Sequence, residues 1–185
     1  MSLDDYEFQF APTEAHLTAL GKVLVESGVL EDVLELAIWQ MMGVPESIGE
    51  QITTRPNLGQ RVAMLLALVP VRFPSSQDQS EFAIIGQELK SIIGIRNHLA
   101  HAHWGSGVKQ DEPITLNRRN EKGEIVPRQR TWRSNEIERI AARISRVGDE
   151  LILFLEFRGV SCPPLPSKPW KQYRLPLEPK WKDRG

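Results

Sequence analysis

The chain has 185 residues and a mass of 21.0 kDa, and its 41% hydrophobic and 25% charged residues are typical of a globular protein of single-domain size. No apolar run reaches the roughly 18 residues of a membrane-spanning helix, and the acidic start MSLDDYEFQF does not resemble a secretory signal peptide. A single cysteine, Cys162, excludes an internal disulfide and a zinc-thiolate cage. We therefore expect a cytoplasmic protein with no membrane partner.

The net charge of -1 conceals an asymmetry along the chain. Residues 1–60 contain ten acidic and two basic side chains, whereas residues 61–185 contain 14 acidic and 21 basic ones. This distribution excludes a globally basic nucleic-acid-binding protein but permits a local basic surface in the second part.

Hydrophobic periodicity predicts four main helices. The first follows a Thr13 N-cap and ends before Gly43 and Pro45, with Gly28 as a point where it can break. Its apolar residues recur at helical spacing at Leu17, Leu20, Leu24, Leu34, Ile38 and Met41.

A short helix over 46–53 precedes a second main helix, which runs from the N-cap Asn57 through Leu68. The third main helix is predicted from about Ser80 to Trp104. Its inner seam is formed by Ile85, Leu89, Ile92 and Leu99.

The pattern changes after Trp104 and predicts a β-hairpin over about 112–132, with strands at 114–116 and 124–126. Ser134 is the expected N-cap of a final helix to about Phe157. We expect an all-α helical bundle at 1–158 and a proline-rich extended tail at 159–185. The apolar stripe of the final helix comprises Ile137, Ile140, Ala141, Ile144, Val147, Leu151 and Phe154.

Three of the four histidines lie close together near the end of the third main helix. At 100° per residue, Arg96 falls within the apolar seam, so its guanidinium requires a partner, a cleft or an anion. Asn97 and His101 are four residues apart on a flanking polar face, and their side chains can touch.

The string Arg96-Asn97-x-x-x-His101 resembles the Arg-x4-6-His motif of HEPN domains. The segments Glu31–Leu36 and Arg55–Arg61 precede it as they do in many small HEPN-like proteins, and the likeness covers roughly 13–157. The resemblance implies a HEPN-like helical bundle that acts as a homodimer, with two copies of the motif forming one site.

The resemblance further implies a metal-independent endoribonuclease in a toxin or antiviral defence setting, with no cofactor. RNA supplies its own 2′-OH nucleophile, so the protein needs acid-base groups and positive charge. His101 is the expected acid or base, Arg96 the phosphate clamp and Asn97 an orienting group. The expected products are a 2′,3′-cyclic phosphate and a 5′-hydroxyl.

An antitoxin or a defence-system protein is a further partner that the resemblance suggests. HEPN toxins silenced by a nucleotidyltransferase carry a tyrosine two residues after the histidine, where this chain has His103. Modification of a tyrosine at that position is therefore excluded.

A non-catalytic dimeric regulatory or binding module is the alternative. The mannitol-operon repressor family carries a similar Ile-Arg-Asn-x-x-Ala-His string. In that case Arg96 has a structural role and bonds a backbone end or an acid such as Glu31 or Glu35.

Weaker signals concern substrate contact. His103 and Trp104 are second-tier candidates, and Arg139, Arg143 and Arg146 form a basic line that either guides a phosphate backbone or is simply a solvated helix face. The pattern predicts no metal site, because His101 and His103 diverge on a helix and no cysteine lies near His98. Basic and aromatic residues alternate in the tail, which suits either nucleotide stacking or anchoring on a protein surface.

Overall fold

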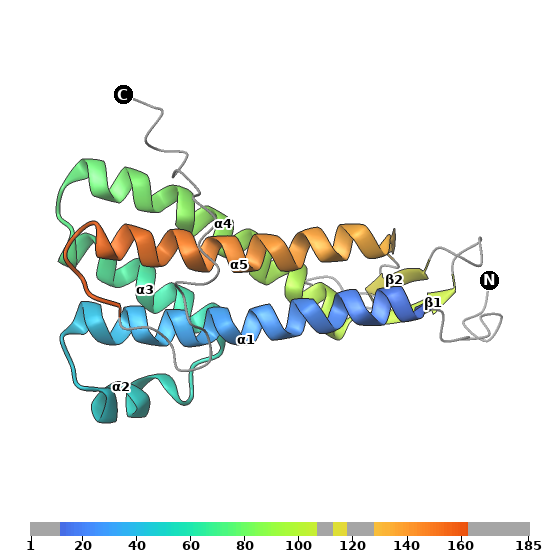
Figure 1. Ribbon diagram of the computed structural model, residues 1–185, viewed down its shortest axis with the longest axis horizontal. Helices are drawn as coiled ribbons and strands as arrows, with labels where there is room; N and C mark the ends of the chain where they lie inside the picture. The colour runs from blue at the N-terminus through green and yellow to red at the C-terminus, as the bar shows by residue number, and fades with distance from the viewer. Residues whose placement is uncertain (1–11, 107–112, 118–127, 163–185) are drawn as a thin grey trace. The chain divides into compact units, whose positions relative to one another are not determined.

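The computed structural model describes residues 12–106, 113–117 and 128–162, and these are mostly helical, in agreement with the all-α class (Figure 1). None of the helices in these ranges is both long enough and apolar enough to cross a membrane. The predicted tail lies outside the described residues from 163 onward. In chain order the elements are α1 (Glu14–Met42), α2 (Glu46–Thr53), α3 (Leu58–Arg72), α4 (Ser76–His101), β1 (His103–Ser106), β2 (Pro113–Asn117), β3 (Arg128–Thr131) and α5 (Ser134–Glu156).

The chain divides into two compact units, each assembled from segments distant in sequence. The first, the motif unit, comprises the described parts of Met1–Ser27 and Gly94–Arg143. The second, the α2–α3 unit, comprises the described parts of Gly28–Ile93 and Ile144–Gly185. All members of the proposed Arg96-Asn97-His101 motif belong to the motif unit.

Helix α1 is continuous through Gly28, so the break expected there does not occur. The hydroxyl of Ser27 donates to the carbonyl of Val23, 2.6 Å away, which satisfies this buried polar group within the helix. Gly43 ends the helix with a φ of 67°, a conformation that glycine adopts without steric cost.

The expected apolar side of α1 is only partly buried. In the motif unit, Ala19 and Val23 are 0% and 1% exposed, whereas Leu17 and Leu24 are 47% and 51% exposed. The latter two lie about 100° around the helix from Val23, so the core takes a different face from the one predicted. Leucines at helical spacing therefore mark an exposed apolar strip here.

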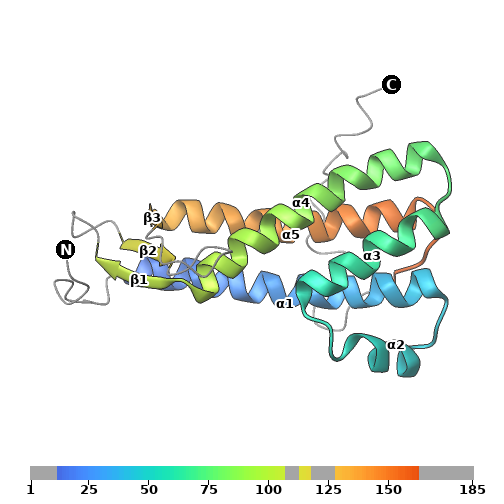
Figure 2. The same cartoon turned by 180° about the vertical axis from the view of Figure 1, so that it is seen from behind.

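The α2–α3 unit is built around the predicted stripes of α3 and α5 (Figure 2). Asn57 caps α3 as expected, in a capping box with Gln60, but the helix continues beyond Leu68 to Arg72 and contains Pro70 in its last turn. The core residues of this unit include Leu34, Ile38, Leu65, Leu89, Ile144, Leu151 and Phe154.

Arg61 of α3 is the main polar link in this unit. Its side chain is 10% exposed and forms ion pairs with Glu31 at 2.9 Å and Glu35 at 2.6 Å, both on α1. It also donates to the carbonyl oxygen of Thr53 at 3.0 Å. Burial raises the pKa of Glu35, an effect that the Arg61 charge opposes.

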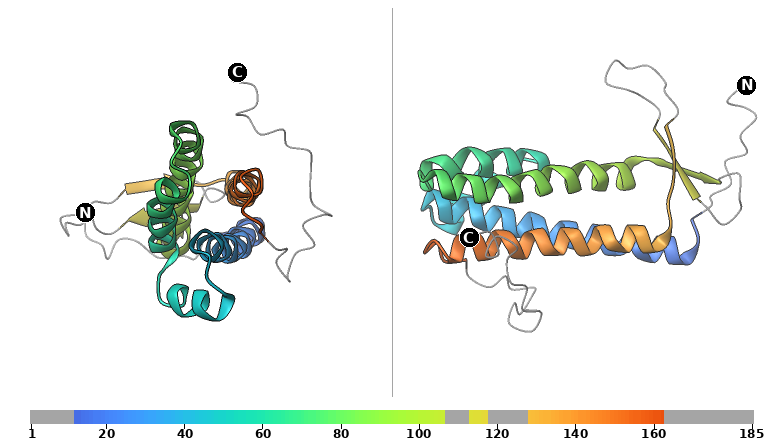
Figure 3. Two further views of the ribbon diagram at one scale, coloured as in Figure 1. Left: turned by 90° about the vertical axis from the view of Figure 1, so that its left-hand side faces the viewer. Right: turned by 90° about the horizontal axis from the view of Figure 1, so that it is seen from above.

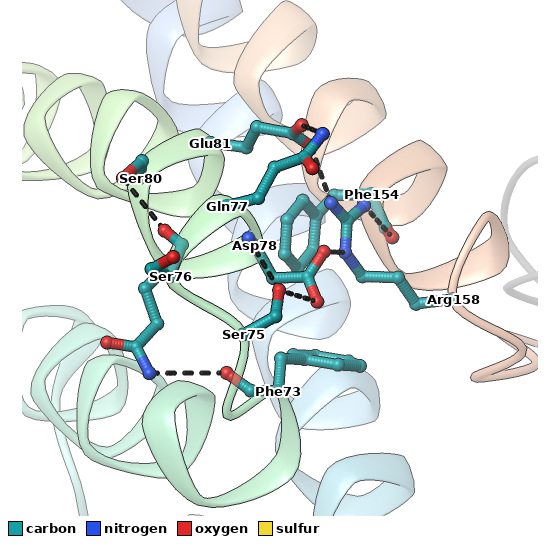
Figure 4. A network of polar contacts seen from close by, with 10 residues as sticks. Phe73, Ser75, Ser76, Gln77, Asp78, Ser80, Glu81, Phe154 and Arg158 are labelled. Atoms are coloured by element: carbon teal, nitrogen blue, oxygen red, sulfur yellow. Dashed lines mark hydrogen bonds and ion pairs between the residues drawn. The ribbon is translucent and has the colours of Figure 1, made fainter.

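A second network joins the start of α4 to the residues just after α5 (Figure 4). The Arg158 guanidinium donates to Asp78 at 2.6 Å and to Glu81, and it lies 3.7 Å from the ring centroid of Phe154. The Ser75 hydroxyl donates to the Asp78 carboxylate at 2.7 Å. The Ser75 and Arg158 hydrogen bonds lower the pKa of Asp78.

The motif unit contains a three-stranded antiparallel sheet in the order β1-β2-β3 (Figure 3). The register pairs Trp104 with Thr115 and Thr115 with Arg130. The predicted strand at 114–116 is confirmed within β2, but its following partner lies at 128–131 and not at 124–126, which lies outside the described residues. Strand β1 was predicted to be helical.

Helix α5 begins at Ser134, which is its first residue and not its cap. The carboxylate of Glu136 accepts a hydrogen bond from the backbone N–H of Arg133, 2.9 Å away. This satisfies a donor that the helix itself leaves free. Within the motif unit Ile137, Ile140 and Ala141 are buried, as the predicted stripe requires.

Candidate functional site

The proposed site lies where α4 ends and β1 begins. The sequence pattern predicted a helix to Trp104, but α4 ends at His101 and Trp104 lies on β1. The indole Nε1 of Trp104 donates to the carbonyl oxygen of Leu99 at 3.1 Å. Because the last carbonyls of a helix lack helical donors, this bond caps α4 and explains the early end.

Arg96 lies on α4 between two buried residues of its seam, Ile92 and Leu99, and it is itself half-buried. Its Nη1 donates to Oδ1 of Asn97 at 3.2 Å. Its Nε is buried and has no hydrogen-bond partner in the described parts of the chain. Arg96 also forms no ion pair with any described residue. The predicted seam position is thus confirmed, and the charge lacks an acidic partner within these limits.

Asn97 and His101 are both exposed, and the structure brings only Asn97 into contact with Arg96. Helical geometry puts His101 about 40° from Asn97 but about 140° from Arg96 around α4. The imidazole and the guanidinium of one chain therefore point in different directions.

The acids suggested as structural partners of Arg96 are engaged elsewhere. Glu31 and Glu35 both form ion pairs with Arg61 of α3. The described structure therefore gives Arg96 neither of these partners.

The second-tier candidates have different outcomes. Trp104 is half-buried and serves as the cap of α4, so its indole N–H is occupied. His103 lies on β1, but its side chain is outside the description.

The predicted basic line lies on α5 and spans both compact units. Arg139 and Arg146 are exposed, while Arg143 is half-buried and engaged in an interaction of its own. Only Arg139 and Arg143 belong to the motif unit.

Trp132 supports the end of α4 in a way that the sequence did not reveal. It is 1% exposed, its ring centroid lies 5.9 Å from that of His98, and Arg130 lies 3.8 Å over its ring. Its carbonyl oxygen accepts a hydrogen bond from Nε2 of the buried His16 at 3.1 Å. His98 is therefore a half-buried packing residue and not a solvent-facing one.

His16 was also missed, although it shares the buried face of α1 with Ala19 and Val23. A carbonyl oxygen only accepts, so Nε2 carries a hydrogen. Nδ1 is 2.7 Å from the Thr13 hydroxyl and completes the pairing of the ring. This histidine is a satisfied core residue.

An open apolar pocket of about 170 Å³ adjoins the end of α4 within the motif unit. No lining residue is charged, so the pocket is suited to apolar contact and not to a phosphate. Its lining consists of Leu20, Val23, Leu24, Leu99, Ala100 and Trp104.

Metal-ligand and nucleophile chemistry find little support in the described ranges. They contain no group of three or more His, Cys, Asp or Glu side chains placed to hold a metal ion. Burial raises the pKa of the Cys162 thiol to about 11, so the thiol is protonated at neutral pH and is a poor nucleophile.

Comparison with known proteins yields no relative. No protein-family model matches the chain. No curated protein and no solved structure matches it at a significant level.

Proposed function

We propose that this protein is a metal-independent endoribonuclease of the HEPN type, working as a homodimer. The observation that carries the proposal is the state of Arg96: a half-buried cation beside the exposed His101 turn, without an acidic partner among the described residues. A desolvated cation of this kind favours an anionic ligand, and a phosphodiester is the anion that the motif resemblance suggests.

The division of labour follows from the side chains. Arg96 would hold the phosphate and stabilise the charge that develops on it, because a guanidinium offers several donors in one plane. His101 is exposed and makes no hydrogen bond to a described residue, so it is accessible for proton transfer. Asn97 accepts from Arg96 and would orient the guanidinium.

A dimer supplies what one chain lacks. Cleavage through the 2′-OH needs one group to remove a proton and another to protonate the leaving 5′-oxygen. Each chain has one His101, and it points away from Arg96 of the same chain. Two chains would provide two imidazoles and two guanidinium groups to one RNA strand.

Incubation of the purified protein with end-labelled RNA in EDTA tests the proposal. We expect cleavage that survives chelation, leaves a 2′,3′-cyclic phosphate and falls about 100-fold or more in Arg96→Ala. Arg139→Ala, which removes an exposed arginine of the same unit, is the matched control and should retain most of the activity. Cleavage that disappears with EDTA would contradict the metal-free mechanism.

The toxin or defence setting is part of the proposal and rests on the motif resemblance. Expression of the wild type is expected to slow host growth, and expression of His101→Ala is expected not to. An antitoxin or defence partner would then be sought by co-expression that restores growth.

A non-catalytic binding module is the second candidate. It is favoured by the Arg96–Asn97 hydrogen bond, which already occupies one donor of the guanidinium, and by the exposed leucines of α1. RNA that is bound but left intact under all conditions would support this candidate.

A further inference from the structure

We propose that the apolar face of α1 formed by Leu17, Leu20, Gly21 and Leu24 is the surface on which a second copy of this chain docks. This inference rests on the proposed function only for its consequence at His101. The docking itself is argued from the shape and chemistry of the face and is tested without RNA cleavage.

The face is apolar and open to solvent. Leu17 and Leu24 are 47% and 51% exposed, and Leu20 is half-buried between them. The four residues fall within about 100° of one another around α1 and so form one strip. An exposed strip of leucines at this spacing is costly unless a partner covers it.

The strip has both protrusions and recesses. Leu17 and Leu24 project from it two turns apart, whereas a Cβ built on Gly21 would meet no atom within 4 Å. The pocket of about 170 Å³ lies beside Leu24 and includes Leu20 in its wall. A two-fold interface uses one patch on both copies, so such a patch must offer a knob and a hole together. This strip does so.

The absence of charge favours a protein partner over the RNA backbone. None of the four strip residues carries a charge, and neither do Ala100 and Trp104 on the far wall of the pocket. A phosphate backbone is held by lysine and arginine, which this surface lacks. A second copy presents the same leucines and would bury them.

The location connects the interface to the proposed site. Ala100 directly precedes His101, and Trp104 caps the turn of α4 that ends there. A copy seated on the strip would therefore meet the end of α4 that carries His101. Under the proposed function, this brings the second imidazole to the site.

Sedimentation velocity of the full chain tests the inference. We expect a wild-type dimer and a dissociation constant raised about 30-fold or more in Leu24→Glu. Ile84→Glu is the matched control, because Ile84 is 50% exposed and lies on α4 in the other unit. It should leave the dimer intact. A wild-type monomer, or equal effects of the two changes, overturns the inference.

Gly21→Ala provides a second variant that does not depend on a buried charge. Because nothing lies near its added methyl group, it should stabilise the helix of the monomer, yet it should weaken the dimer by holding the two strips apart. A dimer unaffected by both Leu24→Glu and Gly21→Ala overturns the inference. Loss of RNA binding in Leu24→Glu with an unchanged mass would show that the strip takes a nucleobase, and it also overturns the inference.

The outcomes separate docking from catalysis. A dimer that depends on Leu24 but cleaves no RNA leaves the interface in place and removes the nuclease. RNA cleavage by a monomer, or by a dimer insensitive to the strip, removes the interface and leaves the nuclease to be explained.

Discussion

The guanidinium of Arg96 donates a hydrogen bond to the side-chain oxygen of its neighbour Asn97, 3.2 Å away. Asn97→Asp would replace that neutral acceptor by a carboxylate and neutralise the cation in a local ion pair. We expect RNA cleavage to fall about 100-fold, close to the effect of Arg96→Ala. Asn97→Ala leaves the cation free and should cost about tenfold or less. Initial rates on a labelled oligonucleotide measure both, and equal losses in the two variants would contradict the role of Arg96 as an anion clamp.

The histidines at 101 and 16 should separate function from stability. His101 is exposed and makes no hydrogen bond to a described residue, so His101→Ala should abolish cleavage and change the free energy of unfolding by less than about 0.5 kcal/mol. His16 is 6% exposed and bonded to Thr13 and Trp132. His16→Ala should cost about 2–3 kcal/mol, because it leaves a cavity and an unpaired carbonyl. Urea unfolding followed by circular dichroism checks the pair.

Gly49 is required by the indole of Trp39. A Cβ at this position would lie 2.4 Å from Cγ of Trp39, and the indole is held by a hydrogen bond from its Nε1 to the Thr53 hydroxyl at 3.1 Å. Gly49→Ala should therefore destabilise the α2–α3 unit by about 1–3 kcal/mol, despite the better helix propensity of alanine.

Gly28→Ala is the control for that substitution. Gly28 lies within α1 and a Cβ there would meet nothing within 4 Å, so the change should stabilise the protein by up to about 1 kcal/mol. Shifts of the same sign in the two variants would contradict the packing account of Gly49.

The Asp78–Arg158 contact predicts a pH dependence of stability. The Ser75 and Arg158 hydrogen bonds lower the pKa of Asp78 below its ordinary 3.8. Its contribution is therefore fully present above pH 3.8 and is lost as the pH falls through the lower folded pKa. Asp78→Asn should lower the unfolding midpoint at pH 7 and flatten the decline of the midpoint in acid.

Ser75→Ala should produce part of the same change, since the Ser75 bond is the larger cause of the lowered pKa. The double variant should be less destabilised than the sum of the two single effects, because the residues share one contact. Thermal unfolding from pH 2 to pH 7 measures this, and a strictly additive double variant would count against the coupling.

Arg61 should be among the most sensitive positions of the α2–α3 unit. Arg61→Met removes the buried partner of Glu31 and Glu35 and should cost about 3 kcal/mol. Arg55→Met, at an exposed arginine, should cost less than about 0.5 kcal/mol. Similar losses in the two variants would show that the ion pairs contribute little.

Local signals predicted the helices well. Thr13, Asn57 and Gly43 punctuate the chain by short-range rules of capping and left-handed backbone, and these rules hold with few distant contacts. The apolar stripes of α3 and α5 were likewise readable, because each helix buries one face. The seam position of Arg96 follows from the same periodicity and is confirmed.

Tertiary contacts decided what periodicity could not. The end of α4 at His101 depends on the indole of Trp104 turning back to Leu99, and the partner of β2 depends on strands whose spacing has no local signature. The burial of Val23 in place of Leu17 on α1, and the pairing of Glu31 with Arg61, depend on which neighbours each helix meets. Sequence by itself determined helix positions and the motif, since these arise from neighbours in the chain. Only the folded structure decided which leucines stay exposed and which arginine lacks an acid, since those properties belong to contacts between distant segments.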